Sequence, residues 1–446
     1  MNTTTRARAR RAAGAAGAAA ALSLGLACSA AGSAPGTAGT ASTAPASPPA
    51  QSVATPTPTP LPGVGTPPPT GLTPTQIANA YNLGPLRQRG IDGAGQTIVI
   101  VDSFGSPSIA KDLTDFDAAF GLPAPPSLKV IQPAGPVPAY TDTTTRSGWA
   151  SETDMDVEWA HVIAPAAAIV LAETPTAETE GIAGFPQIDT ALDFVLSHHL
   201  GQVISQSFGA TEETFSSVAQ LQSLRGPYEL AQRDHVTVLA ASGDNGASGE
   251  TLDEKSVYPT PVVEWPASDP LVTAVGGTEL KLSPAGQRVA PDIAWNEGGG
   301  GPSHVFPRPA YQNGVASVTG RHRGIPDISM DASCSSPVPV FGSYLGGGGW
   351  QTSCGTSLAT PLMAGIVALA DQVAGHPLGL INPVLYKMLA SHSPGLTDVV
   401  SGDNSLRADD GSPTISGFSA RPGFDLVSGV GTVNGAQFVP ELARGG

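Results

Sequence analysis

The hydrophobic residues of the chain form short β-branched runs that alternate with longer amphipathic stretches. The run at 97–101 is continuous, as in a strand buried on both faces of a sheet. Three further runs predict strands and three stretches predict helices: strands at 168–172, 203–207 and 236–240, and helices at 108–120, 188–199 and 216–232. This repeated strand–helix order predicts an α/β fold with a doubly wound, mostly parallel sheet flanked by helices.

Two short serine-containing segments lie at the carboxyl ends of predicted strands. Ser207-Phe208-Gly209 starts at the last residue of one strand, and Ser242-Gly243-Asp244 lies just beyond the next one along the chain. Binding sites in doubly wound sheets gather at the carboxyl ends of the strands. We therefore expect both segments to border a functional site.

A candidate nucleophile lies in Gly355-Thr356-Ser357, shortly before the apolar segment Ile366–Ala370, which predicts a helix. A serine at the start of a helix lies near free backbone N–H groups and the positive end of the helix dipole. Such donors can hold the oxyanion that a nucleophilic serine generates. Gly-Thr-Ser before a helix is also an ordinary N-cap, so the motif alone allows either interpretation.

A nucleophilic serine needs a base, and none of the eight histidines lies in a recognisable His-Gly-Thr setting. A predicted helix offers carboxylates instead. Glu152 and Asp156 are four residues apart and share one face, at about 40° around the axis. His161 lies about 180° from Glu152 and points elsewhere. Asp154 and Glu158 form a second pair on another face, so periodicity cannot decide between a functional pair and a solvated acidic surface.

Charged residues make up only 13% of the chain, while glycine (54) and proline (43) are frequent. This composition is typical of a compact, loop-rich extracellular protein. The net charge is −16, and the first 72 residues contain four arginines but no acid, so the remainder is more acidic still. Such a surface repels nucleic acid and excludes it as a partner. It suits an acidic medium, where partial protonation relieves the repulsion.

The first 71 residues predict export followed by a tether. Residues 1–31 have an arginine-rich start, an Ala/Leu run and small residues, as in a secretory signal peptide. Leu24–Cys28 resembles a lipobox apart from Gly25, so simple cleavage and a lipid anchor at Cys28 both remain open. Residues 32–71 are rich in Pro, Thr and Ala and predict an extended tether. The protein is expected outside the cell, either free or attached as a lipoprotein to the outer face of the cell membrane.

Three cysteines are present, and removal or lipidation of Cys28 leaves Cys334 and Cys354 as an even pair. In an oxidising compartment such a pair predicts a disulfide. The bridge would close a loop of about 20 residues and contribute about 3 kcal/mol by the chain-entropy estimate. It would also brace the loop that carries Ser357; two free thiols are the alternative.

Several segments, in fixed order between residues 72 and 446, resemble the sedolisin family of serine-carboxyl peptidases. That resemblance implies a peptidase domain with a subtilisin-like fold. The matching segments are Glu152–Trp159 with Ala164-Pro165, Ala241–Gly246, Trp265–Ser268 with Val275–Thr278, Gly299–Ser303, Pro326–Ser329, and Gly355–Ser357 with Pro361.

The resemblance implies a role for each of four residues. Ser357 is the nucleophile, Glu152 its general base, and Asp156 orients Glu152. Asp244 contributes to the oxyanion site together with the backbone N–H of Ser357. A carboxylic acid donates a hydrogen bond only while protonated, and an unperturbed aspartate loses its proton near pH ~4. The expected function is therefore an acid-active endopeptidase that cleaves protein or peptide substrates through an acyl-enzyme.

The same resemblance implies one structural Ca²⁺ near the carboxyl terminus. Its ligands would be the side chains of Asp398 and Asp425 and the carbonyls of Val399, Arg421 and Gly423, because calcium takes six or more oxygens. Arg421 replaces the glycine usual at this position, and a positive φ there would make arginine costly. An acidic surface loop is the alternative interpretation.

Two competing functions remain. Family members usually carry a large N-terminal prodomain, and the polar tether does not resemble one, so we expect folding without it or with help in trans. A catalytically silent cell-surface binding protein on the same fold is therefore possible, although all four catalytic residue types are present. The second alternative is an ordinary subtilisin with Asp102 as the triad acid, and it fails because the chain has no suitable histidine after that aspartate. The protein is expected to be a monomer.

Overall fold

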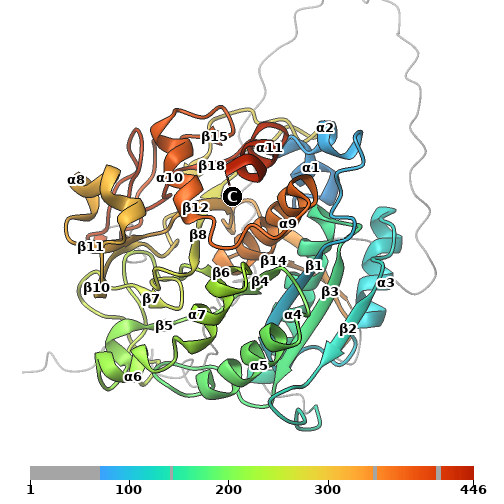
Figure 1. Ribbon diagram of the computed structural model, residues 1–446, viewed down its shortest axis with the longest axis horizontal. Helices are drawn as coiled ribbons and strands as arrows, with labels where there is room; N and C mark the ends of the chain where they lie inside the picture. Colours follow the sequence, from blue (N-terminus) through green and yellow to red (C-terminus); the bar gives the residue numbers. More distant parts are fainter. Residues whose placement is uncertain (1–70, 141–143, 345–348, 408–412, 446) are drawn as a thin grey trace, which may run out of the picture.

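The computed structural model describes residues 71–140, 144–344, 349–407 and 413–445. The predicted signal peptide, Cys28 and almost all of the predicted tether lie outside the described residues. Within them, the elements pack around one central sheet (Figure 1).

The central sheet has eight strands in the order β12-β8-β6-β4-β1-β3-β2, with β9 added to β8. Every pairing in it is parallel except that of β8 with β9. The predicted parallel, doubly wound sheet is thus confirmed. Its strands are β1 (Thr97–Ser103), β2 (Leu128–Ile131), β3 (Ala168–Thr174), β4 (Val203–Gln206), β6 (Thr237–Ala241), β8 (Thr273–Glu279), β9 (Ile293–Ala294) and β12 (Ile328–Asp331).

Helices cover both faces of the sheet, because alternate strand residues point to opposite sides. On β1, Ile98 and Ile100 belong to one hydrophobic core, whereas Val99 and Val101 belong to the other. The first core includes α3 (Ile109–Phe120), α4 (Thr144–Ile163), α9 (Thr356–Ala374), α10 (Asn382–Ala390) and α11 (Gly435–Gly445). The second core includes α5 (Phe185–Ser197), α6 (Val218–Gln222) and α7 (Gly226–Arg233).

One predicted helix is wrong. Residues 216–232 form two helices, α6 and α7, separated by a turn at residues 223–225. Pro227 lacks a backbone N–H and fits the first turn of a helix but not its interior, so a new helix begins at Gly226. The other predicted strands and the helices at 108–120 and 188–199 are confirmed to within a few residues at their ends, and the apolar segment 366–370 lies inside the longer α9.

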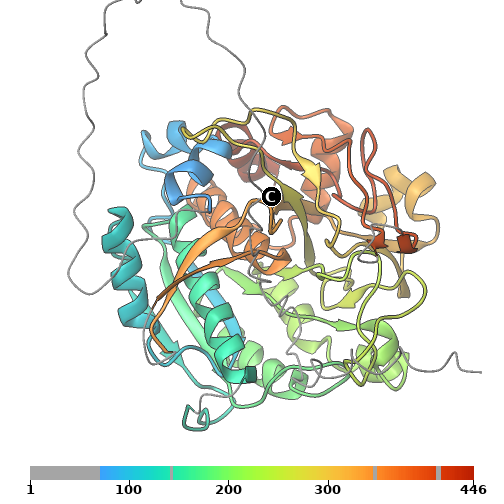
Figure 2. The same cartoon turned by 180° about the vertical axis from the view of Figure 1, so that it is seen from behind.

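Short elements outside the sheet complete the fold. The hairpin of β13 and β14 lies across α4 and is seen in orange from behind in Figure 2. It leads directly to the candidate nucleophile. The short helices and strands outside the central sheet are α1 (Pro74–Ala80), α2 (Gly84–Arg87), α8 (Ala316–Thr319), β5 (Ala210–Thr211), β7 (Glu264–Trp265), β10 (Gly301–Pro307), β11 (His322–Ile325), β13 (Val338–Gly342), β14 (Gly349–Ser353), β15 (Leu396–Thr397), β16 (Leu406–Arg407), β17 (Pro413–Ile415) and β18 (Thr432–Val433).

Helices α4 and α9 pack closely together on the same side of the sheet. A Cβ on Gly365 of α9 would lie only 2.5 Å from the Cβ of Ile163, at the end of α4, so the close approach requires glycine. Among the described helices, α9 alone is long and apolar enough to cross a membrane, but it is mostly buried inside the protein. Its apolar character is therefore that of a core helix, and its contact with α4 brings the predicted site residues together.

Candidate active site

The predicted nucleophile lies where α9 begins. Ser357 is the second residue of α9 and is fully buried, with its hydroxyl Oγ 3.5 Å from the carbonyl oxygen of Ser207. A hydrogen bond from Ser357 lowers the pKa of Glu152, although burial and the nearby Asp102 and Asp244 raise that pKa well above its ordinary value, burial most of all. The helix contact between α4 and α9 thus places the predicted base beside the predicted nucleophile.

Asp156 lies one turn along α4 from Glu152 and is completely buried. Its Oδ1 accepts a hydrogen bond from the Ser207 hydroxyl at 2.9 Å. Burial is the largest cause that raises the pKa of Asp156, followed by the charges of Asp102 and Glu152, while Ser207 opposes the rise. Glu152 and Asp156 are therefore an interacting pair of carboxyl groups, as the helical spacing predicted.

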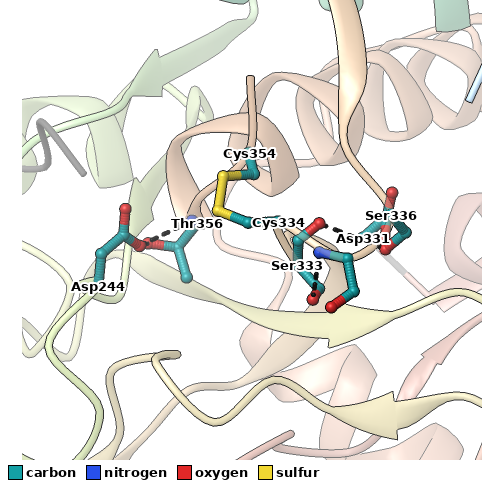
Figure 3. Close-up of a disulfide and its surroundings, with 8 residues drawn as sticks. Asp244, Asp331, Ser333, Cys334, Ser336, Cys354 and Thr356 are labelled. Carbon is teal, nitrogen blue, oxygen red and sulfur yellow. Dashed lines mark hydrogen bonds between the residues drawn. A yellow bond between two sulfur atoms is a disulfide. The ribbon is translucent and has the colours of Figure 1, made fainter. Parts of the chain in front are cut away.

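Asp244 reaches the start of α9 from the loop after β6 (Figure 3). Its Oδ1 accepts hydrogen bonds from the backbone N–H of Thr356, at 2.8 Å, and from the Thr356 hydroxyl, at 2.7 Å. Gly355 has a φ of +113°, and a Cβ there would lie 2.6 Å from Oδ2 of Asp244. Glycine is thus required both by its backbone conformation and by the space that Asp244 occupies.

The predicted disulfide between Cys334 and Cys354 is present, with the two Cα atoms 5.1 Å apart. The bridge spans 20 residues and encloses the β13–β14 hairpin. Figure 3 shows it beside Thr356 and Asp244. Because Cys354 lies two residues before α9 begins, the bridge fixes the loop that carries Ser357.

The second acidic pair on α4 faces a different neighbour. Glu158 accepts hydrogen bonds from the backbone N–H of Phe341 in β13, at 3.3 and 3.2 Å. Asp154 lies against Gly342, where a Cβ would be 2.7 Å from its Oδ2. Both side chains are buried, so the interpretation of α4 as a solvated acidic surface is wrong. This pair attaches the hairpin to α4.

His161 points away from the candidate site, as its position on the helix predicted. Its Nε2 lies 2.8 Å from the carbonyl oxygen of Pro123 and 3.2 Å from Oδ1 of Asp117. Among the described residues, no histidine forms a hydrogen bond with Ser357 or Glu152. The carboxyl groups are therefore the bases available to Ser357.

Asp102 is a third carboxyl group of the site, although the sequence suggested it only as the triad acid of an ordinary subtilisin. It lies near the carboxyl end of β1, is fully buried, and raises the pKa of both Glu152 and Asp156. Burial raises the pKa of Asp102 itself to about 7, against a hydrogen bond with Thr153. Sequence reasoning considered it only with a histidine partner. Its position at the carboxyl end of a buried strand, where sites in parallel sheets gather, was the signal that could have placed it beside Glu152 and Asp156.

The predicted calcium ligands converge on one loop near the carboxyl terminus. The backbone N–H of Gly423 donates to Oδ2 of Asp398 at 2.9 Å, and that of Arg421 donates to Oδ2 of Asp425 at 2.9 Å. Arg421 is not among the described non-glycine residues with positive φ, so arginine is unstrained there. Within the described ranges, the carbonyls of Val399, Arg421 and Gly423 accept no hydrogen bond, which suits them as metal ligands.

A search for clusters of metal-binding side chains cannot test this site, because most of its predicted ligands are backbone carbonyls. Among the described residues, no group of three or more His, Cys, Asp or Glu side chains could hold a metal ion. The predicted calcium set contains only two carboxylates and otherwise backbone carbonyls. Carbonyl oxygens are ordinary calcium ligands, so the residues present fit the ion.

Comparison with known proteins defines the class to which this fold and site belong. Residues 146–405 match the subtilase family model. Kumamolisin from Bacillus sp. (strain MN-32) is 31% identical over 390 residues, which cover 84% of this chain and 64% of that protein. Tripeptidyl-peptidase 1 from Homo sapiens is 34% identical over 254 residues, covering 53% of this chain and 42% of that protein.

A solved structure agrees with both relatives. Pseudomonas sedolisin, a serine-carboxyl proteinase complexed with two molecules of pseudo-iodotyrostatin, superposes with a TM-score of 0.72 at 26% identity. The match covers 84% of this chain and 98% of that one. The chain therefore belongs to the subtilase family and, within it, to the sedolisins. It spans a little under two thirds of the length of relatives such as kumamolisin.

Proposed function

We propose that this protein is an acid-active serine-carboxyl endopeptidase that hydrolyses peptide bonds. The observation that supports this most strongly is the grouping of Ser357, Glu152 and Asp244 at the start of α9. Tripeptidyl-peptidase 1 is a peptidase by name and Pseudomonas sedolisin is described as a serine-carboxyl proteinase, which favours the same reaction class here. Protein or peptide chains would be its substrates.

In the proposed reaction, Oγ of Ser357 attacks the carbonyl carbon of the peptide bond and its proton passes to Glu152. The developing oxyanion accepts a hydrogen bond from protonated Asp244 and another from the Ser357 backbone N–H. Glu152 then gives the proton to the leaving amine as the C–N bond breaks, which leaves an acyl-enzyme. Water, activated by Glu152, hydrolyses the ester and restores Ser357. Asp156 orients Glu152 throughout.

The surroundings of Glu152 suit it to this task. Burial disfavours its charged form, so once deprotonated it holds an incoming proton more tightly than an exposed glutamate does. The reaction needs Glu152 without a proton and Asp244 with one. Each requirement gives one limb of a bell-shaped pH profile.

The pH dependence of cleavage tests the proposed function. We expect kcat/KM for an unfolded protein or a long peptide to peak below neutral pH when measured between pH 3 and 8. Above the optimum, activity should fall by about tenfold per pH unit, because the protonated fraction of one acid falls that fast. Enzyme returned from pH 8 to the optimum serves as the control for unfolding. A maximum at neutral or alkaline pH would refute the acid mechanism, and no cleavage at any pH would favour the binding protein.

We also infer that one Ca²⁺ stabilises the loop of residues 421–425, held by Asp398, Asp425 and the carbonyls of Val399, Arg421 and Gly423. The ion would join this loop to the segment after β15 and has no part in the reaction. Mutual repulsion of the two carboxylates would be relieved by its charge.

Chelation tests the calcium site. A ligand at a hundred times its Kd stabilises the folded state by about 2.7 kcal/mol, so excess EGTA should lower the unfolding temperature by several degrees. Added Ca²⁺ should restore it, and Asp398→Asn should remove the response. Asp403→Asn is the matched control, since Asp403 is a nearby acid that contacts Arg407. An unfolding temperature that chelation leaves unchanged would refute the site.

We further infer that residues 72–446 act as one exported, monomeric peptidase domain. The disulfide between Cys334 and Cys354 supports an oxidising location outside the cytoplasm. The signal at residues 1–31, the tether and a lipid anchor at Cys28 remain proposals from the sequence. Metabolic labelling with a radioactive fatty acid, compared between the natural chain and Cys28→Ala, would distinguish an anchored protein from a freely secreted one.

A further inference from the structure

The carbonyl group of Ser357 has an unusual partner. In an α-helix this carbonyl would accept a hydrogen bond from the backbone N–H four residues later, which is position 361. Pro361 stands there inside α9 and has no N–H to donate. The Ser207 hydroxyl takes that place, at 3.1 Å from the Ser357 carbonyl oxygen.

The same Ser207 hydroxyl also contacts Asp156. Oγ of Ser207 lies 2.9 Å from Oδ1 of Asp156, and all three side chains, including that of Ser357, are fully buried. One hydroxyl group therefore lies between a carboxyl of the predicted catalytic pair and the backbone of the nucleophile. Pro361 removes the backbone donor that would otherwise share the Ser357 carbonyl with this hydroxyl.

The number of available protons limits how these contacts can form. A serine hydroxyl has a single hydrogen to donate, and both the Ser357 carbonyl and an ionised carboxylate can only accept. Both contacts are hydrogen bonds at the same time only when Asp156 carries a proton on Oδ1 and donates it to Ser207. When Asp156 ionises, the Ser207 hydroxyl turns toward it, and the Ser357 carbonyl is left without a donor.

We propose that Ser207 is a positioning residue that couples the protonation state of Asp156 to the backbone of the nucleophile Ser357. The inference rests on the proposed peptidase function and adds a residue to it. With Asp156 protonated, the chain Asp156–Ser207–Ser357 fixes the first turn of α9. Ionisation of Asp156 releases that turn.

The groups around Asp156 are consistent with this role. Asp102 from β1 and Glu152 from α4 face it and oppose its ionisation, as burial also does. From the segment after β4 the uncharged Ser207 contacts Asp156, and Ser207 in turn contacts Ser357 at the start of α9. Since Ser207 is a hydrogen-bond partner that lowers the pKa of Asp156, its loss should make Asp156 still harder to ionise.

Kinetics of Ser207→Ala test the inference. We expect kcat to fall about 10- to 100-fold while KM changes less than about twofold, because the Ser207 side chain is fully buried and acts through Ser357. The alkaline limb of the pH profile should shift to higher pH, because ionisation of Asp156 no longer releases the first turn of α9. Ser205→Ala is the matched control: Ser205 lies two residues earlier on β4, is fully buried, and its hydroxyl has no hydrogen-bond partner in the described part of the chain. Equal kinetics of the two variants would overturn the proposal.

Pro361→Ala separates positioning from a merely structural contact. It restores a backbone donor to the Ser357 carbonyl. If Ser207 only satisfied that carbonyl, Pro361→Ala would rescue kcat in the Ser207→Ala background. We expect no rescue and a pH limb that stays shifted, because the link to Asp156 is still missing. Full rescue would overturn the proposal.

A second substitution covers a failure of Ser207→Ala to fold. Ser207→Cys keeps a weaker donor of similar size, and we expect an intermediate fall in kcat with an intermediate pH shift. A wild-type pH profile in this variant would overturn the coupling. If cleavage by the wild type depends on Ser357 but the Ser207 variants keep the wild-type kcat and pH profile, this inference is refuted and the proposed function stands.

Discussion

Replacing Ser357 with alanine is expected to lower kcat for peptide cleavage by about 10⁴-fold or more, without loss of folding. Removal of a nucleophile in related catalytic groupings has effects of this order, because covalent catalysis is lost entirely. The residue is fully buried at the first turn of α9, and alanine fits that position at the cost of the hydrogen bond with Glu152 and a long hydroxyl contact with the Ser207 carbonyl, at 3.5 Å. Steady-state cleavage at the acid optimum measures the effect.

The control for this variant is Ser353→Ala. Ser353 ends β14, pairs with Val338 and lies only four residues before Ser357. It should retain kcat within about threefold, as surface and loop substitutions away from the chemistry usually do. Cleavage that survived Ser357→Ala would exclude the acyl-enzyme mechanism, whereas loss in both variants would indicate damage to the hairpin.

Asp244→Asn is expected to change the pH profile more than it changes the maximum rate. An asparagine amide can donate a hydrogen bond to the oxyanion at any pH, whereas an aspartic acid donates only while protonated. Its carbonyl oxygen can still accept from the backbone N–H and hydroxyl of Thr356. The alkaline limb should therefore move to higher pH or disappear.

Asp244→Ala is the contrasting variant. It removes the donor at every pH and should lower kcat by about 10²- to 10³-fold, as loss of one oxyanion donor does in other peptidases. It also leaves the Thr356 hydroxyl without this acceptor, so unfolding should be measured alongside. If Asp244→Asn kept the natural decline at high pH, ionisation of Asp244 could not be its cause.

Hydrophobic pattern predicted the sheet well because its strands are buried on both faces. The β1 run alternates between two cores, so every residue from Ile98 to Val101 is apolar and the strand is unmistakable. The single helix predicted at 216–232 failed at Gly226-Pro227, where local backbone chemistry outweighs amphipathic spacing. Short hairpins such as β13–β14 carry little periodic signal and were not predicted.

The sequence alone could not choose between the two acidic pairs on α4. Both pairs have helical spacing, and only the neighbours separate them: Glu152 meets Ser357, whereas Glu158 meets the backbone of Phe341. The place of Asp102 beside Glu152 and Asp156 was not predicted for the same reason, since it depends on which helix crosses the end of β1. Likewise, the fit of Arg421 depended on its φ angle, which residue type does not reveal.

Helix α4 also bears, through its acidic side chains, on how the chain reaches its folded state. Its four carboxyl groups are buried, and burial raises the pKa of each above its ordinary value: Glu152, Asp154, Asp156 and Glu158. A folded state that binds protons more tightly than the unfolded chain takes up protons as it forms. This stabilisation is fully present below the ordinary carboxyl pKa of about 4 and is lost as pH rises through the raised values. Folding is thus a proton-consuming reaction, and acidification of the medium drives it.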